Sequence, residues 1–213
     1  MIGSALVGSL EADGHSVVRV VRHDPTSPNE IRVTDGFDGI NGVVHLAGEP
    51  IEKRWNDDQK RKIRESRVQG TQAVAQACAT ATNGPSVLVS GSAIGFYGDT
   101  GGKTVDEASP AGSDFLAGVV VDWEAATAVA EAAGVRVVHA RTGVVQSAAG
   151  GMLKRQLLPF KLGLGGKIGD GKFWLSWVTL IDEVRALRFA LETSTLRGPV
   201  NLTAPNPATN AAY

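Results

Sequence analysis

The chain has 213 residues, a formal net charge of -1 and a single cysteine, Cys78. That length suffices for one large α/β domain, or for a domain with a smaller region attached, and the near-zero charge gives no reason to expect nucleic acid or an acidic membrane as a partner. One cysteine excludes an internal disulfide framework, and without a membrane-length apolar run or a signal-peptide pattern we expect a cytoplasmic protein.

Short apolar runs alternate with longer helical patterns as far as Arg141. The runs that predict strands are Val17–Val21, Val43–Ala47, Val87–Ser90 and Val135–Ala140. Each is rich in β-branched residues and nearly continuous, which is typical of a strand covered on both faces. The helices expected between them are Gly3–Ala12, ending at Asp13 and Gly14, then Asn56–Ala81, with Asn56 as its N-cap, and Ser113–Ala133. This order predicts an α/β fold with a doubly wound parallel sheet.

Beyond Arg141 the pattern is less regular and rich in glycine. The expected elements are a helical stretch from Gly150 to Leu162, a glycine-rich loop Gly163–Gly171, a helix Asp182–Glu192 capped by its own first residue, and a strand Val200–Thr203. The loop carries Lys167 and Lys172 but lacks the ending of a phosphate-binding P-loop, so a mobile lid is the preferred interpretation. We interpret Trp174 and Trp177 as core aromatics.

The stretch Val87–Gly98 carries the strongest functional signal. Its apolar run ends abruptly in hydroxyl groups and glycines, the pattern of a buried strand that stops at a functional loop. In an open α/β sheet, ligands bind just beyond the carboxyl ends of the strands. We therefore expect the hydroxyl groups of Ser90, Ser92 and Tyr97 to lie at the site.

Several segments spread over nearly the whole chain resemble one family. They are His45–Ile51, Ile63–Thr71, Ser90–Gly98, Leu162–Gly166, Trp174–Trp177 and Asn201–Pro207. Together they are similar to the extended, NAD-dependent epimerase/dehydratase-like branch of the short-chain dehydrogenase/reductases, and most of all to its atypical members, called epimerase family proteins or, loosely, SulA-like proteins. The resemblance implies a Rossmann-type sheet that binds a dinucleotide, with a small C-terminal region over the substrate cleft.

The resemblance also sets the expected division of the chain. Residues 1–145 would form the NADP-binding Rossmann-type domain, and residues 146–213 would form part of the C-terminal substrate-cleft region, interleaved with the last strands of the sheet. The family begins with a strand and a GxxGxxG turn, of which only Gly3 would remain. We therefore expect the first strand to be absent from this sequence, together with a further C-terminal segment.

Three residues near the start are expected to contact the cofactor. Gly3 is interpreted as the last glycine of the phosphate turn, beside a helix N-terminus that attracts pyrophosphate; the alternative is a small residue in a closely packed helix. Arg22 and His23 follow the second strand of the family, where NAD enzymes carry an acid for the ribose hydroxyls and an arginine accommodates a 2′-phosphate. Asp24 comes too late for that acid, so NADP(H) is favoured over NAD(H); the alternative is a solvated basic strand end.

The ends of later strands supply the other expected cofactor contacts. Leu46, Ala47 and Gly48 end the next strand, and alanine and glycine let a flat ring or a ribose approach the backbone. In the family this position lines the cofactor; the alternative is a plain turn after a strand. The same predicted set includes Ser90, Gly91, Thr142 and Gly143.

The expected catalytic residues depart from those of the family. Ser92 matches its catalytic serine, and the hydroxyl is expected to bind a substrate carbonyl oxygen, with a bond to loop amides as the alternative. The family's tyrosine and lysine, one helical turn apart on one face, fall on Leu116 and Val120, and its helix asparagine falls on Arg67. Tyr97 is a substitute acid that needs a neighbouring cation at neutral pH, and Arg67 is the candidate neighbour. The alternative for Tyr97 is packing on the cofactor or the loop.

Other polar residues leave more than one interpretation open. Arg141 ends a strand and either meets a substrate carboxylate or phosphate, or closes an ion pair with a core acid. Glu49 could pair with Asp106 or Glu107. The four histidines are scattered, and no spacing indicates a metal site.

Taken together, these residues predict an NADP(H)-binding oxidoreductase or epimerase-like protein that acts on a small carbonyl or alcohol substrate through a non-standard active site. The expected catalytic residues are Ser92, Tyr97 and Arg67. The alternative is a non-catalytic dinucleotide-binding protein with a regulatory or scaffold role, which the loss of the tyrosine and lysine favours. The expected assembly is a homodimer.

Overall fold

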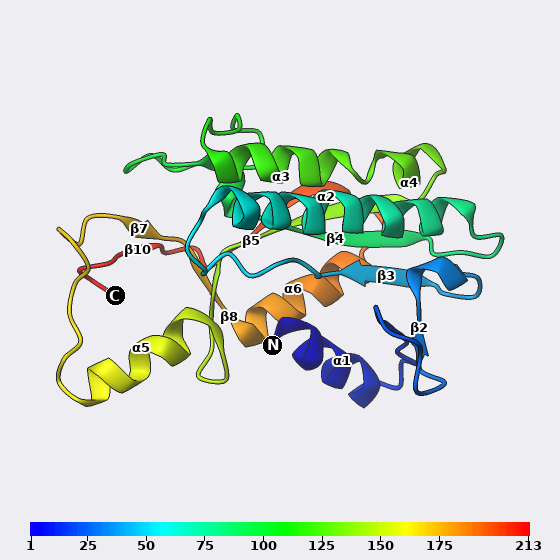
Figure 1. Cartoon of the computed structure of the whole chain (residues 1–213), viewed down its shortest axis with the longest axis horizontal. Helices are drawn as coiled ribbons and strands as arrows, with labels where there is room; N and C mark the ends of the chain where they lie inside the picture. The colour runs from blue at the N-terminus through cyan, green and yellow to red at the C-terminus, as the bar shows by residue number, and fades with distance from the viewer.

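The computed structural model describes residues 1–213 and has three layers (Figure 1). Its central sheet has four parallel strands in the order β3-β4-β5-β9. These strands are β3 (Gly42–His45), β4 (Val87–Ala93), β5 (Arg136–Thr142) and β9 (Gly198–Leu202). One face is covered by α2 (Asp57–Thr80), α3 (Phe115–Ala125) and α4 (Ala128–Ala132), and the other by α1 (Ile2–Ala12) and α6 (Leu180–Glu192). The predicted doubly wound α/β fold is confirmed.

Alternate residues of the central strands divide the core between the two faces of the sheet. Val87 and Val89 of β4 pack with side chains of α1 and α6. Leu88, between them, points the other way and packs with Cys78 and its neighbours on α2. Burial of side chains of this size stabilises the fold by about 1.5–3 kcal/mol each. Because both faces are covered, the strand is apolar without a break, and Ser92 further along β4 points toward α2 and α3.

Four of the five predicted strands are present, as β3, β4, β5 and β9, with ends that differ from those expected. β3 ends at His45, before Ala47, whereas β4 continues through Ser92 to Ala93. The reason is the ladder to β5, which pairs Ala93 with Thr142 and so continues beyond the apolar run. Ser92 therefore lies inside the end of the strand rather than beyond it, and Ser90 lies within the strand as predicted.

The predicted buried strand Val17–Val21 is wrong in extent and in burial. Only β1 (Arg19–Val20) is a strand, and both of its residues are exposed. It pairs in parallel with β2 (Glu30–Ile31) in a separate sheet of two strands. Since this small sheet is not bonded to β3, the helix layers that bury the central strands do not cover β1.

The helix ends follow the expected capping chemistry in two of three places. Gly14, with φ of 84°, follows α1 as predicted, and the Asn56 side chain accepts a hydrogen bond from the Gln59 backbone amide at 2.8 Å at the start of α2. The predicted cap of α6 by Asp182 is wrong. The cap is Thr179, whose hydroxyl oxygen accepts from the Asp182 amide at 3.0 Å, so that Asp182 lies inside the first turn.

The single helix predicted for Ser113–Ala133 is wrong, because the chain forms two helices, α3 and α4, separated by a turn. At the break the Thr127 hydroxyl donates to the backbone oxygen of Glu124 at 2.8 Å. Such a side chain competes with the backbone bonds of a helix. The segment contains no proline at this point, so its alanine-rich sequence still resembles one helix.

The segments after β5 form a less compact part of the molecule. They include β6 (Val144–Gln146) paired with β8 (Trp177–Thr179), β7 (Trp174–Leu175) paired with β10 (Ala208–Thr209), and α5 (Gly151–Lys161). α5 lies at the edge of the molecule and buries none of its residues (Figure 1). Residues 163–171 contain no helix or strand, as expected. Trp174 is 49% exposed, so its predicted place in the core is wrong, because a two-stranded sheet leaves one side to solvent.

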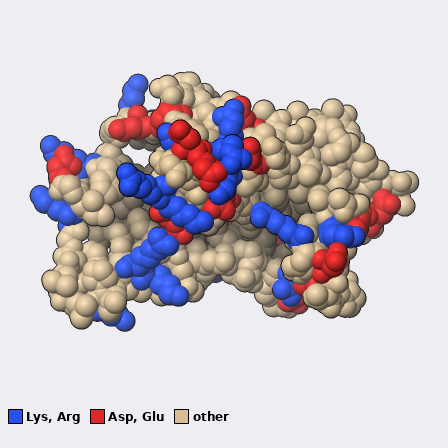
Figure 2. Space-filling view, in the orientation of Figure 1, with Lys and Arg blue, Asp and Glu red and all other residues tan.

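The surface carries charges of both signs. On the face shown in Figure 2, Lys and Arg side chains lie beside Asp and Glu side chains rather than in one patch of a single sign. On α2, for example, both Arg61 and Lys62 pair with Asp58. No helix of the structure combines the length and the apolar character that a membrane span requires.

Candidate functional site

Three polar residues form one row across the central sheet at its carboxyl edge. Ser92 of β4 is the register partner of Arg141 of β5, and Arg141 is the partner of Asn201 of β9. Register partners on neighbouring strands point to the same face of a sheet. Residues far apart in sequence thus meet at the edge where open α/β sheets bind their ligands.

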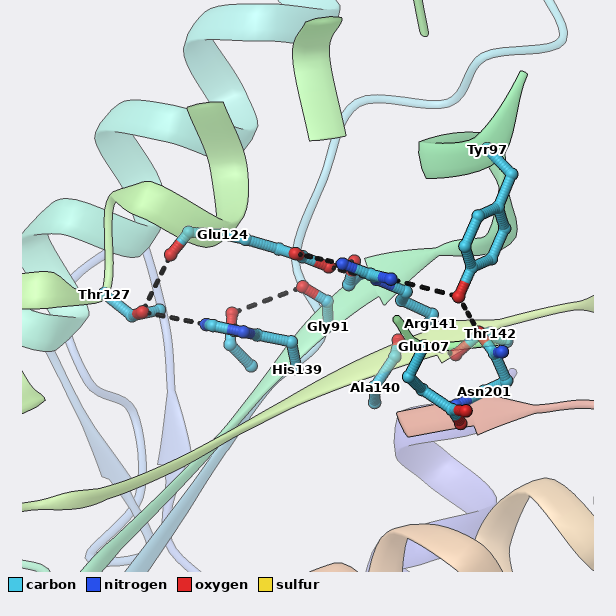
Figure 3. A network of polar contacts seen from close by, with 12 residues as sticks. Gly91, Tyr97, Glu107, Glu124, Thr127, His139, Ala140, Arg141, Thr142 and Asn201 are labelled. Atoms are coloured by element: carbon cyan, nitrogen blue, oxygen red, sulfur yellow. Dashed lines mark hydrogen bonds and ion pairs between the residues drawn. The ribbon is translucent and has the colours of Figure 1, made fainter. Parts of the chain in front are cut away.

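Glu124 of α3 reaches this row and binds two of its members (Figure 3). Its carboxylate accepts hydrogen bonds from Arg141 Nε and Nη2, each at 2.8 Å, and from the Ser92 hydroxyl at 2.6 Å. Burial alone would raise the pKa of Glu124, but the bonds from Arg141 and Ser92 outweigh burial and hold the pKa below its usual value. Arg141, only 3% exposed, therefore closes an ion pair with a core acid, one of the two interpretations left open by the sequence.

Tyr97 joins the same group of residues from η2 (Ile94–Tyr97), the short 3-10 helix that follows β4. Its hydroxyl accepts a hydrogen bond from Arg141 Nη1 at 3.0 Å and donates one to Asn201 Oδ1 at 2.7 Å (Figure 3). The Arg141 guanidinium carbon also lies 3.5 Å from the centre of the Phe96 ring, a cation–π contact. The cation beside Tyr97 is Arg141, so the prediction that Arg67 is its neighbour is wrong.

Arg67 lies on α2 and packs against the loop after β3. Its Nη1 donates to the backbone oxygen of Glu49 at 2.9 Å, and its guanidinium lies 5.1 Å from the centre of the Trp123 ring. A Cβ on Gly48 would lie 3.2 Å from the guanidinium carbon. Burial lowers the pKa of Arg67, yet a guanidinium stays charged at neutral pH. Arg67 therefore brings positive charge to Gly48, in the loop after β3 that is predicted to line the cofactor.

One face of α3 carries the positions of the family's tyrosine and lysine. Leu116, Val120 and Glu124 are spaced by four residues, so they lie one above another on this face. Leu116 lies beside Gly95, Val120 is 4% exposed, and neither side chain can transfer a proton. Sequence reasoning missed Glu124, although this spacing was a signal that could have identified it.

Ser90 and Gly91 are used in packing between strands. The fully buried Ser90 donates its hydroxyl to the backbone oxygen of Gly91 at 3.2 Å. A Cβ on Gly91 would lie 3.0 Å from the backbone oxygen of His45 and 3.2 Å from the ring of Trp123. A side chain at this position would push β4 away from β3 and α3. Leu46 and the residues after it follow β3 at the same edge of the sheet.

A buried carboxyl group lies on the opposite face of the sheet edge. The Thr142 hydroxyl donates to Glu183 Oε1 at 2.8 Å, while Glu183 Oε2 has no hydrogen-bond partner. Glu183 is 0% exposed, and burial raises its pKa to about 7. Gly143 is required for packing, since a Cβ there would lie 2.8 Å from the backbone oxygen of Ser176. The sequence analysis did not predict a buried carboxyl group at Glu183. Its position among apolar residues of α6 was the sequence feature that could have indicated one.

The residues predicted for the nucleotide side are open to solvent. No atom lies within 4 Å of a Cβ built on Gly3, so close helix packing, one interpretation of this glycine, is wrong. Arg22 and His23 are exposed, and His23 Nδ1 lies 2.8 Å from the backbone oxygen of Asp24. Burial, followed by the charge of Arg22, lowers the pKa of His45 to about 4.

The predicted carboxylate pair at Glu49 is wrong, because each of these acids has another partner. Glu49 pairs with Lys53 at 2.8 Å, Glu107 accepts from the Asn201 amide at 2.7 Å, and Asp106 bonds within its own turn. The structure contains no group of three or more His, Cys, Asp or Glu residues that could hold a metal ion.

The fold and the site define a class: a Rossmann-type α/β protein of the short-chain dehydrogenase/reductase kind, with a serine at the expected strand end and an altered helix face. Residues 1–202 match the model of the NAD dependent epimerase/dehydratase family. An epimerase family protein of Mycobacterium tuberculosis is 45% identical over 222 residues, which cover 100% of this chain and 73% of that protein. The chain belongs to this family.

Solved structures agree with this assignment. The human epimerase family protein SDR39U1 (isoform 2), solved with NADPH, is 35% identical with a TM-score of 0.92, over 100% of this chain and 74% of that one. A nucleoside-diphosphate sugar epimerase from Corynebacterium glutamicum is 42% identical with a TM-score of 0.88. That match covers 99% of this chain but 46% of the other, so this chain spans less than half of the Corynebacterium protein.

Proposed function

We propose that this protein binds NADP(H) and transforms a small carbonyl or alcohol substrate, either in a net redox reaction or through a transient oxidation within an epimerisation. The observation that carries the proposal is the meeting of Ser92, Tyr97 and Arg141 at the carboxyl edge of the parallel sheet. The human relative solved with NADPH supports the choice of cofactor.

The residues on the nucleotide side fit a phosphorylated dinucleotide. The first turn of α1 has no capping side chain and no acidic residue, so its free amides and dipole are available to a pyrophosphate beside Gly3. Arg22, exposed after β1, would meet a 2′-phosphate, which favours NADP(H) over NAD(H). The other residues proposed to contact the cofactor are His23, Leu46, Ala47, Gly48, Ser90, Gly91, Thr142 and Gly143.

Around the substrate, the chain offers hydroxyl groups and fixed positive charge. When bound, the nicotinamide supplies a carbon that takes or gives a hydride. Ser92 would contact the reacting oxygen of the substrate, and Tyr97 or an ordered water would move its proton. Arg141 donates a hydrogen bond to the oxygen of Tyr97, and Arg67 adds positive charge beside Gly48.

NADPH titration, followed by incubation with a panel of carbonyl compounds, tests the proposal. We expect saturable NADPH binding, NADPH consumption with at least one compound, and a loss of turnover of about 100-fold in Ser92→Ala. Ser109→Ala is the matched control, because that serine hydroxyl also donates to a carboxylate, Asp106, but at the surface. Failure of the wild-type protein to bind NADPH refutes the proposal.

A second candidate is a non-catalytic dinucleotide-binding protein with a regulatory or scaffold role. Leu116 and Val120 favour it, since they place hydrocarbon where the family has its proton donor and its lysine. Tight NADPH binding without turnover of any compound in the panel would support this candidate and argue against the enzyme.

We further propose a cytoplasmic homodimer, in which residues 1–145 bind the cofactor and residues 146–213 lie over the substrate. Light scattering on the purified protein tests the assembly. A mass of two chains supports the dimer, and a mass of one chain refutes it.

A further inference from the structure

We infer that Glu124 fixes Ser92 as a hydrogen-bond acceptor, so that the site binds the hydroxyl group of an alcohol in preference to the carbonyl group of a ketone. The inference rests on the proposed function for the position of the substrate oxygen at Ser92. It reverses the role expected from the sequence, in which Ser92 donates to a carbonyl oxygen. Glu124 acts through Ser92 and is therefore a positioning residue.

The charge of Glu124 fixes the direction of its hydrogen bond to Ser92. Arg141 donates Nε to one carboxylate oxygen of Glu124 and Nη2 to the other, each at 2.8 Å. A carboxylate that accepts two such bonds from a guanidinium is ionised and has no proton to donate. The bond of 2.6 Å between Ser92 and Glu124 Oε1 must therefore use the proton of the serine.

The bond to Glu124 limits the hydrogen bonds that the Ser92 hydroxyl can make to a ligand. A hydroxyl group has one proton and two lone pairs. Because the serine O–H already donates its hydrogen bond to Glu124, only the oxygen lone pairs are left for a ligand. They can accept a hydrogen bond from an alcohol, whereas a carbonyl oxygen also brings lone pairs and would stay without a donor there. A polar group left in this way loses the stabilisation of one hydrogen bond.

The neighbouring hydroxyl groups have the same polarity. Tyr97 donates to Asn201 Oδ1 at 2.7 Å, and on the opposite face of the sheet edge Thr142 donates to Glu183 Oε1 at 2.8 Å. Each proton is thus committed to an acceptor within the protein. Tyr97 also accepts a hydrogen bond from Arg141 Nη1 at 3.0 Å, so on the face of Ser92 neither hydroxyl group has a proton left to offer, and a ligand there has to bring its own.

Glu124 also differs from the rest of its helix face. It lies one turn beyond Val120 and is the ionisable residue among the three spaced positions on that face. Glutamine at this position would keep the shape but bring an amide that can donate to Ser92. Glu124→Gln would then release the serine proton and reverse the preference of the site.

The direction of the bond is tested by carbon-13 NMR titration of Glu124 in protein without cofactor. Ser92→Ala keeps the Arg141–Glu124 pair and removes the serine alone. If Ser92 donates, this change removes a bond to the ionised form, and the pKa of Glu124 rises. An unchanged or lowered pKa overturns the inference. Ser109→Ala is the control and leaves the titration of Glu124 unaltered.

The ligand preference is tested with cyclohexanol and cyclohexanone as competing probes in saturation-transfer NMR. We expect the wild-type protein to favour the alcohol by about fivefold, Ser92→Ala to bind both equally, and Glu124→Gln to favour the ketone. Equal binding by the wild type, a ketone preference, absence of binding by both probes, or an alcohol preference retained in Ser92→Ala overturns the inference.

The design separates this inference from the proposed function. NADPH binding is measured on the same samples, so a failure to bind NADPH refutes the proposed function while the titration still decides the polarity of Ser92. If Glu124→Gln does not fold, because it leaves the buried Arg141 without its ion-pair partner, the comparison of wild type with Ser92→Ala decides alone.

Discussion

The two sides of the candidate site differ in how the chain holds them. On one side lies a buried network, which consists of Ser92, Tyr97, Glu124, Arg141 and Asn201. Its hydrogen bonds are 2.6–3.0 Å long, and its central guanidinium is 3% exposed. On the side proposed to bind the nucleotide, Arg22 and His23 are exposed, and a Cβ built on Gly3 would meet no atom within 4 Å beyond its own neighbouring backbone.

The buried half of the candidate site is therefore formed by folding itself, before any ligand binds. A buried charge is tolerable only with a partner, so the network has to be complete for the protein to fold. Exposed side chains carry no such requirement, and their final positions depend on what they bind. Substitutions in the buried network should therefore reduce stability, whereas substitutions on the nucleotide side should reduce affinity alone.

The largest expected effect is that of Arg141→Met. It leaves Glu124 buried without its ion-pair partner, and we expect the free energy of unfolding to fall by about 3–5 kcal/mol. Urea unfolding measures the change. Arg185→Met, which removes an exposed arginine paired with Asp182, is the control and should leave stability unchanged. An Arg141→Met variant as stable as the wild type would contradict the claim that the buried network has to be complete for the protein to fold.

Glu183 tests how burial alone acts on a carboxyl group at the edge of the site. Burial raises its pKa to about 7 from 4.5, so between these values the folded state keeps a proton that the unfolded chain has lost. The free energy of unfolding should therefore fall as pH rises through this window, by about 3 kcal/mol in full.

Glu183→Gln removes this penalty. Urea unfolding at about pH 5 and about pH 8 should show a variant whose stability depends less on pH than that of the wild type and exceeds it at the higher pH. Glu11→Gln, on the exposed side of α1, should keep the wild-type dependence. Identical pH curves for Glu183→Gln and the wild type would contradict the prediction.

Tyr97→Phe tests the contribution of a single hydroxyl group to the buried network, without removing a charge. It deprives Arg141 Nη1 of an acceptor and Asn201 Oδ1 of a donor, so we expect a loss of about 1–3 kcal/mol in thermal or urea unfolding. Tyr213→Phe is the matched control, since its hydroxyl donates to Gln146 near the end of the chain, at an exposed position. The idea would fail if both changes had the same small effect.

The smallest expected effect on stability is on the nucleotide side. Arg22→Ala should weaken NADPH binding by about tenfold, because it removes the charged hydrogen bond that we propose for the 2′-phosphate, and should leave NADH binding and unfolding unchanged. Fluorescence titration with both nucleotides measures the ratio. Arg19→Ala, in β1, is the control. Equal losses for NADPH and NADH would assign Arg22 no role in choosing between them.

Sequence reasoning placed Ser92 and Tyr97 at the carboxyl edge of the sheet but did not predict the hydrogen bonds of the candidate site. Ser92 and Tyr97 were expected at the carboxyl edge because the change from an apolar run to hydroxyls and glycines is a local signal. Glu124 and Asn201 were missed, since their roles depend on how β4, β5, β9 and α3 lie beside one another. The neighbour of Tyr97 was assigned wrongly as Arg67 for the same reason.

The parallel α/β order, the burial of the central strands on both faces and the caps at Gly14 and Asn56 could be predicted from the sequence. Each of these features depends on residues close together in the chain. The three-dimensional structure was needed to show that Arg141 is the cation at Tyr97, that β1 is exposed, and that Ser92 donates its hydrogen bond to Glu124. Strand register and helix contacts depend on the packing of segments that are far apart in the chain, so they cannot be predicted from any short stretch of sequence.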